Sequence, residues 1–221
     1  MTWASATGRV LGAVYDFGVR REWLARPVGR VLWGADVGEL YAGIRALGEL
    51  PPGSAVLDVP CGGGVALRGL TGGASAGNSA VRYVGVDLSR AMVTRARRRA
   101  ERLGLGGVGL VEADISALPF GDGGFDVCVC FNGLHCLPDP AGAVREMVRC
   151  VRPGGRLVGD VVVSGTGWRQ DRAIGILRRA GLFGRGGGAG DLADWLTGAG
   201  LRVERMARSG AVVYFVGVSG S

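Results

Sequence analysis

The sequence predicts a doubly wound α/β fold, in which helices cover both faces of a mostly parallel sheet. Short apolar runs alternate with helical patterns between about residues 55 and 162, an order typical of parallel strands joined by helical crossovers. The run VCVCF at 127–131 is apolar at every position, as expected for a strand buried on both faces. Two apolar runs near the C-terminus lie close together and predict an antiparallel hairpin at the end of the sheet.

Seven strands are expected in this sheet. Five precede the hairpin, at Ala55–Val59, Tyr83–Asp87, Val108–Glu112, Asp126–Phe131 and Arg156–Val162. The hairpin strands are expected at Leu201–Arg208 and Ala211–Val218, with Ser209 and Gly210 in the turn.

Helices are expected between the strands. Ser89 is placed to cap one of them. Its buried stripe is expected to be Met92, Ala96, Ala100 and Leu103, with its arginines on a solvated face. Asp139 and Pro140 predict the start of another helix, since a carboxylate is favoured at the N-cap and proline at the next position. This helix is expected to end before the Pro153-Gly154-Gly155 turn, and Asp191 and Asp194 open a short helix before the hairpin.

Two regions lie outside this alternation. Residues 1–50 are predicted to form a helical cap that is broken around Arg26-Pro27, and residues 51–221 to form the main domain. Residues 163–190 are predicted to be a lid insertion with a helix at Gln170–Ala180. An apolar lid is suggested by Trp168, Ile174, Leu177, Leu182 and Phe183.

The composition is that of a globular chain with excess positive charge. Hydrophobic residues make up 48% and charged residues 20% of the chain, which argues against disorder. The formal net charge is +7, and every basic residue is an arginine. A positive field attracts anionic partners in general. We expect no specific nucleic-acid partner, and the sequence leaves peripheral membrane contact and oligomeric state open.

The cysteines and the length of the apolar runs indicate the cellular location of the protein. The cysteines are odd in number and form no C-x-x-C pair: Cys61, Cys128, Cys130, Cys136 and Cys150. We therefore expect buried free thiols, no metal site and a cytoplasmic location. No run reaches the ~18 apolar residues that span a bilayer, and residues 1–14 lack the pattern of a signal peptide.

A glycine turn follows the first strand, in VLDVPCGGG at 56–64. Such a turn lets a ligand approach the backbone and offers N–H groups at a helix start. The dinucleotide fingerprint fails because Leu67 stands where the third glycine would be, and a P-loop fails because lysine is absent.

Three successive strands end or turn at an acid: Asp58, Asp87 and Asp114. An acid at the end of the second strand can accept hydrogen bonds from a ribose diol. An acid after the third strand can accept from an adenine amino group. The series therefore predicts an adenosine-containing ligand at this edge of the sheet.

With these motifs, residues 40–218 resemble the class I S-adenosylmethionine (SAM)-dependent methyltransferases. The subgroup is the type 11, ubiquinone/menaquinone-type small-molecule enzymes. The stretches that carry the resemblance are LDVPCGGG at 57–64, GVDLS at 85–89, ADISALPF at 113–120, FDV at 125–127, LPDP at 137–140 and RPGG at 152–155. The resemblance implies a Rossmann-like seven-stranded sheet, SAM as cofactor and methyl transfer to a small molecule.

The resemblance also implies site roles. Asp58, Pro60, Cys61, Gly62 and Gly64 would surround the methionine moiety, with Pro60 in place of the family's usual glycine. Asp87 and Leu88 would lie at the ribose, and Met92, Asp114 and Ile115 at the adenine. Asn132 and Gly133 would line the sulfonium end.

The acceptor side is less defined. His135, the sole histidine, follows the fourth strand and is a candidate general base, with local packing as the alternative. Weaker candidates are Tyr15, Asp16, Trp33 and Tyr41. Because the lid is apolar, we expect a hydrophobic acceptor, such as a lipid, quinone or secondary metabolite.

Other functions remain open. They are an RNA or protein methyltransferase and a non-catalytic SAM-binding protein. The stretch at 132–135 (NGLH) lacks the Asn/Asp-Pro-Pro-Tyr/Phe pattern of enzymes that methylate exocyclic amines. A NAD-dependent oxidoreductase is disfavoured by Leu67, and an arsenic-type enzyme would need its cysteines to converge.

Overall fold

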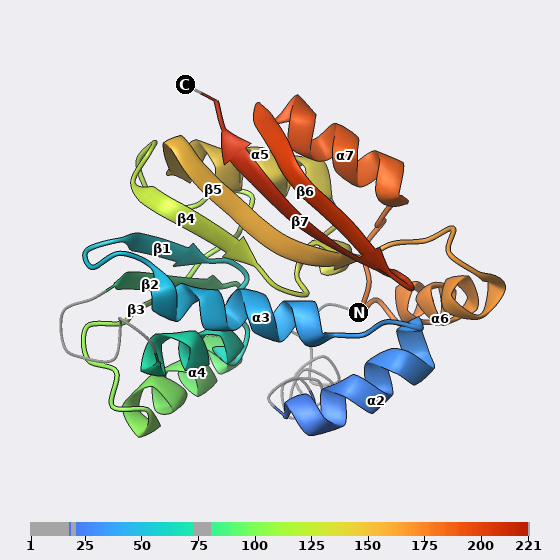
Figure 1. Ribbon diagram of the computed structural model, residues 1–221, viewed down its shortest axis with the longest axis horizontal. Coiled ribbons are helices and arrows are strands. Elements are labelled where there is room, and N and C mark those ends of the chain that lie inside the picture. Colours follow the sequence, from blue (N-terminus) through green and yellow to red (C-terminus); the bar gives the residue numbers. More distant parts are fainter. Residues whose placement is uncertain (1–17, 19–20, 73–80, 221) are drawn as a thin grey trace.

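A seven-stranded sheet runs through the centre of the computed structural model, which describes residues 18, 21–72 and 81–220 (Figure 1). Its strands are β1 (Ala55–Asp58), β2 (Arg82–Asp87), β3 (Gly109–Glu112), β4 (Phe125–Cys130), β5 (Val151–Val162), β6 (Leu201–Ser209) and β7 (Val212–Ser219). The order across the sheet is β3-β2-β1-β4-β5-β7-β6. The first five strands are parallel, and β7 runs antiparallel to both β5 and β6. The predicted doubly wound fold with a C-terminal hairpin is confirmed.

Helices cover both faces of the sheet. One face packs on α5 (Pro140–Cys150) and α7 (Ala189–Gly198). The other packs on α3 (Gly38–Ala46), α4 (Arg90–Arg102) and the 3-10 helix η2 (Val65–Thr71). Short 3-10 turns η1 (Leu47–Glu49) and η4 (Leu134–Cys136) follow α3 and β4. Helices α2 (Glu22–Trp33) and α6 (Trp168–Arg179) contact each other, and α6 follows the end of β5 (Figure 1).

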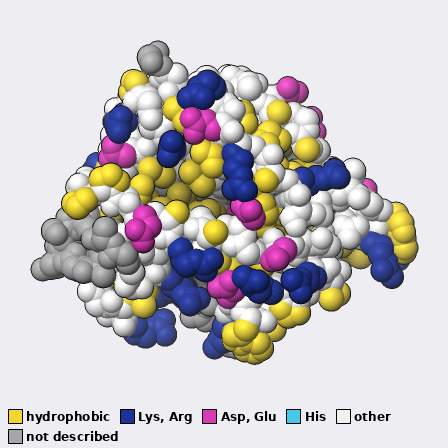
Figure 2. All heavy atoms as spheres, in the orientation of Figure 1, with side chains coloured by type: hydrophobic (Ala, Val, Ile, Leu, Met, Phe, Trp, Pro, Cys, Tyr) yellow, Lys and Arg dark blue, Asp and Glu magenta, His cyan; other side chains and the backbone are white. Residues whose placement is uncertain are grey.

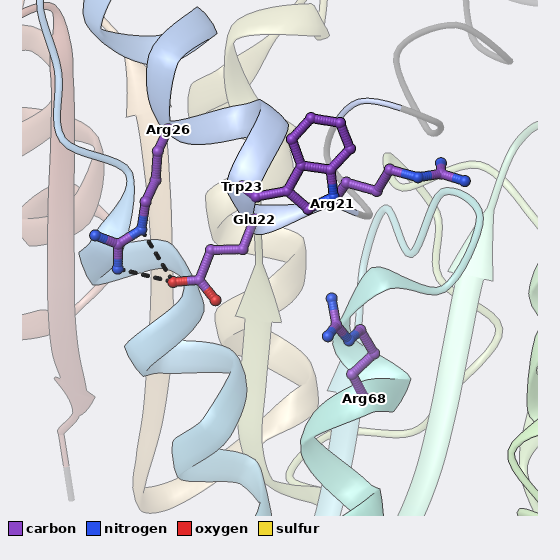
Figure 3. Close-up of a pocket in the computed structure, with 5 residues that line it drawn as sticks. All are labelled: Arg21, Glu22, Trp23, Arg26 and Arg68. Carbon is purple, nitrogen blue, oxygen red and sulfur yellow. Dashed lines mark hydrogen bonds and ion pairs between the residues drawn. The ribbon is translucent and has the colours of Figure 1, made fainter.

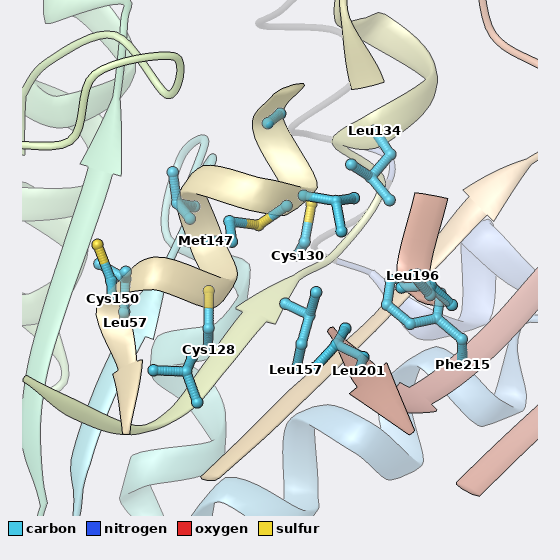
Figure 4. Close-up of a cluster of buried hydrophobic side chains, with 14 of the residues drawn as sticks. Leu57, Cys128, Cys130, Leu134, Met147, Cys150, Leu157, Leu196, Leu201 and Phe215 are labelled. Atoms are coloured by element: carbon cyan, nitrogen blue, oxygen red, sulfur yellow. The ribbon is translucent and has the colours of Figure 1, made fainter. Parts of the chain in front are cut away.

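The core consists of two apolar layers, one on each side of the sheet. Figure 4 shows the layer under α5 and α7, where Cys128, Cys130 and Leu157 from the strands meet Met147 and Leu196 from the helices. Each large apolar side chain buried in this way contributes about 1.5–3 kcal/mol. Cys128 and Cys130 face the same side, as their alternation in the sequence predicted.

The predicted start of the fifth strand is wrong. Strand β5 begins at Val151 rather than Arg156, so the Pro153-Gly154-Gly155 segment lies inside the strand. The pairing with β4 shifts register between Phe125 and Val127, which is how a bulge accommodates extra residues. Gly154 has a φ of +73°, a conformation that glycine adopts without penalty.

Several helix details also differ from expectation. Pro27 lies within α2, on its exposed side, and the break falls at Gly34, where φ is +64°. Between β3 and β4 the chain forms turns and no α-helix. Helix α7 begins at Ala189, before the predicted start at Asp191, whose side chain instead accepts from the Gly188 N–H.

Two helix starts show opposite outcomes. Ser89 occupies the N-cap position of α4 without a side-chain capping bond, and its backbone N–H donates to Asp87. Arg99 of this helix is buried, although its arginines were expected on a solvated face. The predicted cap of α5 is confirmed, since Asp139 accepts from the Gly142 N–H at 2.9 Å.

Helix length and polarity decide whether a helix can cross a membrane. In the part of the chain that the structure describes, the helices are too short or too polar to cross a bilayer. Two of the weaker candidate residues, Tyr15 and Asp16, lie outside the described residues.

Candidate functional site

The glycine turn after β1 is held against the end of β2. The Gly62 N–H donates to Oδ2 of Asp87 at 2.9 Å, and the Ser89 N–H donates to Oδ1 at 2.8 Å. Gly62 and Gly64 have φ values of +51° and +76°, which favour glycine. The predicted turn and the predicted ribose acid therefore form one unit.

Gly62 and Gly64 of this turn have different surroundings. A Cβ on Gly62 would meet no atom within 4 Å, whereas one on Gly64 would lie 2.7 Å from Leu67 and 3.2 Å from Ala96. Gly64 is thus required for packing against η2 and α4. Gly62 presents its backbone to open space, which is what close approach of a ligand requires.

Asp58 is a buried acid at the end of β1. The Tyr83 hydroxyl donates a hydrogen bond to Asp58 Oδ2. Burial, opposed by the Tyr83 hydrogen bond and aided by the negative charge of Asp87, raises the pKa of Asp58 to about 7. A cationic group placed beside Asp58 would favour its ionised form. This acid is therefore suited to receive a ligand amine.

The carboxylate of Asp87 can accept further hydrogen bonds from a polar ligand. Burial raises its pKa, and the N–H groups of Ser89 and Gly62 oppose this shift. Each carboxylate oxygen can accept more than one hydrogen bond, so the two backbone bonds leave capacity for a ligand hydroxyl. The next residue, Leu88, is exposed.

Asp114 lies beyond β3 on the same edge of the sheet. The Ala113 N–H donates to the Asp87 carbonyl at 3.2 Å, which brings this turn beside the end of β2. Asp114 is exposed, and its Oδ1 accepts from the N–H and hydroxyl of Ser116 at 2.9 and 2.8 Å. Met92 and Ile115 are half-buried. The backbone thus gathers the predicted acids at one edge.

Pro60, the departure from the family pattern, packs against Gly133. A Cβ on Gly133 would lie 2.3 Å from Pro60 Cδ and 3.0 Å from Cys130 Sγ. The pyrrolidine ring fits because the facing residue on the β4 side has no side chain. Cys61 is buried, and burial raises the pKa of its thiol well above the usual range, so it is a poor nucleophile.

Asn132, a predicted site residue, is paired with Asp160, which was not predicted. Asn132 has a φ of +54°, and its N–H donates to Asp160 Oδ1 at 3.2 Å. Asp160 is buried, its Oδ2 has no hydrogen-bond partner among the described residues, and burial raises its pKa to about 7. The signal in the sequence is a single acid inside the apolar strand at 157–163 (LVGDVVV).

His135 is buried and acts as a hydrogen-bond acceptor. The Val162 N–H donates to His135 Nδ1 at 3.3 Å, which assigns the ring proton to Nε2. Burial lowers the pKa of His135 to about 3. A general base works best with a pKa near the operating pH, so this environment favours the packing role over the catalytic one.

An aromatic row joins the N-terminal helices to the predicted lid. The Phe183 ring lies 5.9 Å from Trp33 and 4.4 Å from His135, centroid to centroid. The Gly184 N–H also donates to the His135 carbonyl at 3.0 Å. Tyr41, the other candidate in this region, is buried, and burial raises its pKa to about 12.

A separate hollow of about 600 Å³ lies between α2 and η2 (Figure 3). It is lined by Arg21, Glu22, Trp23, Arg26 and Arg68. None of the predicted cofactor residues lines this hollow. Arg26 is paired with Glu22 at 2.8 Å.

The five cysteines are free, and four of them are buried. The described residues contain no cluster of three or more His, Cys, Asp or Glu side chains arranged to hold a metal ion.

Comparison with known proteins relates a part of the chain to one family. Residues 57–159 match the methyltransferase domain family. A protein of transposon TN4556 from Streptomyces fradiae is 43% identical over 107 residues, which are 48% of this chain and 30% of that protein. A demethylmenaquinone methyltransferase of Bacillus cereus is 34% identical over 113 residues, 50% of this chain and 45% of the relative. The matches thus span less than half of these curated relatives.

Solved structures share the fold at low sequence identity. A Haloferax volcanii complex that contains the Trm112 methyltransferase activator matches with a TM-score of 0.69 and 18% identity, over 88% of this chain and 93% of the other. The [4+2]-cyclase SpnF matches with a TM-score of 0.66 and 21% identity, over 82% and 80%. A methyltransferase of Aquifex aeolicus matches at 0.60 and 20%, over 86% and 92%.

Proposed function

We propose that this chain, whose residues 57–159 match the methyltransferase domain family, is a class I methyltransferase that transfers a methyl group from SAM to a small, apolar acceptor. The observation that carries the proposal is the unit formed by Gly62 and Asp87. In it, a glycine backbone facing open space and an acid with spare acceptor capacity lie side by side. Asp58 and Asp114 extend the unit along the edge of the sheet.

The residues present suit SAM. In this proposal Asp87 accepts from the ribose hydroxyls, Asp114 from the adenine amino group, and Asp58 pairs with the methionine amine. The backbone of Gly62 lies beside the methionine moiety. Asn132 and Gly133 border the sulfonium end, and their positions are held by Asp160 and Pro60.

The chemistry places modest demands on the protein. Bound SAM supplies a methyl group already activated as a sulfonium. The chain has to align the acceptor with that methyl and exclude water, and such positioning can supply about 7–11 kcal/mol of the barrier. A base is needed only when the acceptor must lose a proton. With its low pKa, His135 is better suited to shape the site through the aromatic row.

The acceptor class rests on the walls around the sulfonium end. Trp33, Phe183 and His135 form an aromatic row, and in this proposal the row borders the sulfonium end because His135 follows Gly133 by two residues. The lid that contains Phe183 is rich in apolar residues. Apolar and aromatic side chains around a site favour a hydrophobic acceptor, for example a lipid, quinone or secondary metabolite. The demethylmenaquinone methyltransferase relative agrees with this class. The free cysteines suit a cytoplasmic location.

Two observations support other functions. The resemblance to a methyltransferase in complex with its Trm112 activator leaves the acceptor type open, so an RNA or protein acceptor stays as an alternative. Copurifying nucleic acid and binding that weakens steeply with salt would support it. The resemblance to a [4+2]-cyclase shows that the fold does not by itself imply methyl transfer. In that case SAM would bind without being consumed.

Isothermal titration with SAM and S-adenosylhomocysteine tests the proposal. We expect both to bind, and Asp87→Ala to weaken binding at least about tenfold, since a hydrogen bond to a charged group is worth about 1.5–3 kcal/mol. Asp194→Ala, an exposed acid on α7, is the matched control and should bind normally. A folded protein that binds neither compound would overturn the proposal, and methylated product from an apolar hydroxylated acceptor would establish transfer.

A further inference from the structure

Apolar residues make up most of the exposed positions of α2, with Arg30 as the exception, the reverse of what a surface helix normally presents to water. Gly29 is the buried residue of this helix. Trp23 is 73% exposed, Val28 50% and Val31 86%. With Pro27, which is also exposed, they occupy one side of the helix at 3.6 residues per turn. None of the described residues covers this side.

Helix α6 extends the surface and adds charge. Trp168 is 75% exposed and Ile176 55%. Its exposed arginines are Arg169, Arg172 and Arg179. The two helices lie together at one end of the molecule (Figure 1), and Figure 2 shows hydrophobic and basic side chains side by side over them. The exposed residues named on both helices are called the α2–α6 face below.

We propose that the α2–α6 face binds the surface of an anionic lipid bilayer. Tryptophan is enriched at the interface between headgroups and acyl chains, and one stands near the start of each helix, at Trp23 and Trp168. Residues 168–185 hold five arginines and one aspartate. Apolar side chains that enter the interface beside guanidinium groups that meet lipid phosphates are the features of a helix lying in the membrane plane.

Charge argues against a second copy as the occupant. In a twofold dimer the same patch faces itself, so the arginines of α6 would meet their own equivalents. An anionic bilayer neutralises those charges and takes up the apolar side chains at the same time. The inference goes beyond the proposed function. It also implies a source for an apolar acceptor, because Trp33 belongs both to α2 and to the aromatic row.

Vesicle flotation of the full chain tests the proposal. We expect binding to vesicles of phosphatidylcholine mixed with phosphatidylglycerol, little binding to phosphatidylcholine alone, and weaker binding as salt rises. The tryptophan emission should shift to the blue on binding. The triple change Arg169→Gln, Arg172→Gln and Arg179→Gln should weaken binding roughly 10- to 100-fold.

Matched variants make the test specific. Arg97→Gln, Arg98→Gln and Arg102→Gln remove the same charge from exposed positions of α4 and should leave binding unchanged. Val31→Glu should weaken binding, whereas Met206→Glu, at a partly exposed apolar position on β6, should not. If the α4 variant lost as much vesicle binding as the α6 variant, net charge alone would explain the binding, and the proposal would be overturned.

Two further outcomes would also overturn it. One is a folded chain that ignores anionic vesicles. The other is a dimer, seen by sedimentation, that Val31→Glu dissociates while no vesicle binding occurs. SAM titration of the same samples separates the two proposals. SAM binding without vesicle binding contradicts the membrane inference alone, and vesicle binding without SAM binding contradicts the proposed function alone.

Discussion

Replacing Asp160 with asparagine should change how the stability of the protein depends on pH. Asp160 is buried on β5 and lacks a hydrogen-bond partner at Oδ2. Burial raises its pKa in the folded chain from the ordinary 3.8 to about 7, and the Asn132 N–H opposes that shift. The folded state therefore holds this proton up to a higher pH than the unfolded state does.

The sign and size follow from linkage. An acid whose pKa is raised by folding stabilises the protein below the unfolded pKa, and this contribution is lost as pH rises through the folded pKa. A shift of about three pKa units, at about 1.4 kcal/mol each, corresponds to about 4 kcal/mol. The wild type should lose that amount between pH 4 and 8 relative to Asp160→Asn, which carries no charge and mimics the protonated acid.

Urea unfolding of both proteins at several pH values measures this difference. We expect the variant to be more stable by about 1 kcal/mol near pH 4.5 and by about 4 kcal/mol at pH 8. Asp58, whose pKa is also about 7, is present in both proteins, so its contribution largely cancels. A difference between the two proteins that stays constant with pH would refute the reasoning, because Asp160 would then titrate as an exposed acid does.

Two further predictions concern single contacts. Gly133→Ala should destabilise the protein by about 1–3 kcal/mol, because its Cβ would lie 2.3 Å from Pro60 Cδ. In chemical denaturation Gly121→Ala, where a Cβ meets no atom within 4 Å, should be near neutral, and equal effects would contradict the packing explanation. Asp139→Ala should cost about 1 kcal/mol by removing the bond from the Gly142 N–H. An unchanged unfolding midpoint would show that water replaces this cap.

The fold could be predicted because its signals are local. Apolar runs of strand length, the glycine turn at 62–64 and the cap at Asp139 each depend on residues close together in the chain. The acids Asp87 and Asp114 could be placed at one edge because parallel strands bring their carboxyl ends together. The start of β5 could not, since a bulge is decided by pairing across β4 and not by the proline and glycines themselves.

Other features depended on tertiary contacts. Whether Pro60 fits depends on the missing side chain of Gly133, a residue 73 positions away in the sequence. The chemistry of His135 depends on its burial beneath Phe183 and on the Val162 N–H, neither of which a local motif reports. The sequence predicted a helical cap over residues 1–50 but not which of its apolar residues are covered. Val31 faces outward, because a pattern shows which residues are apolar and only packing shows which surface covers them. The sequence by itself determined the sheet, the glycine turn and the acid series, because their physical causes lie within a few residues. Tertiary structure decided the burial, pKa and exposure of individual side chains, because these depend on neighbours far along the chain.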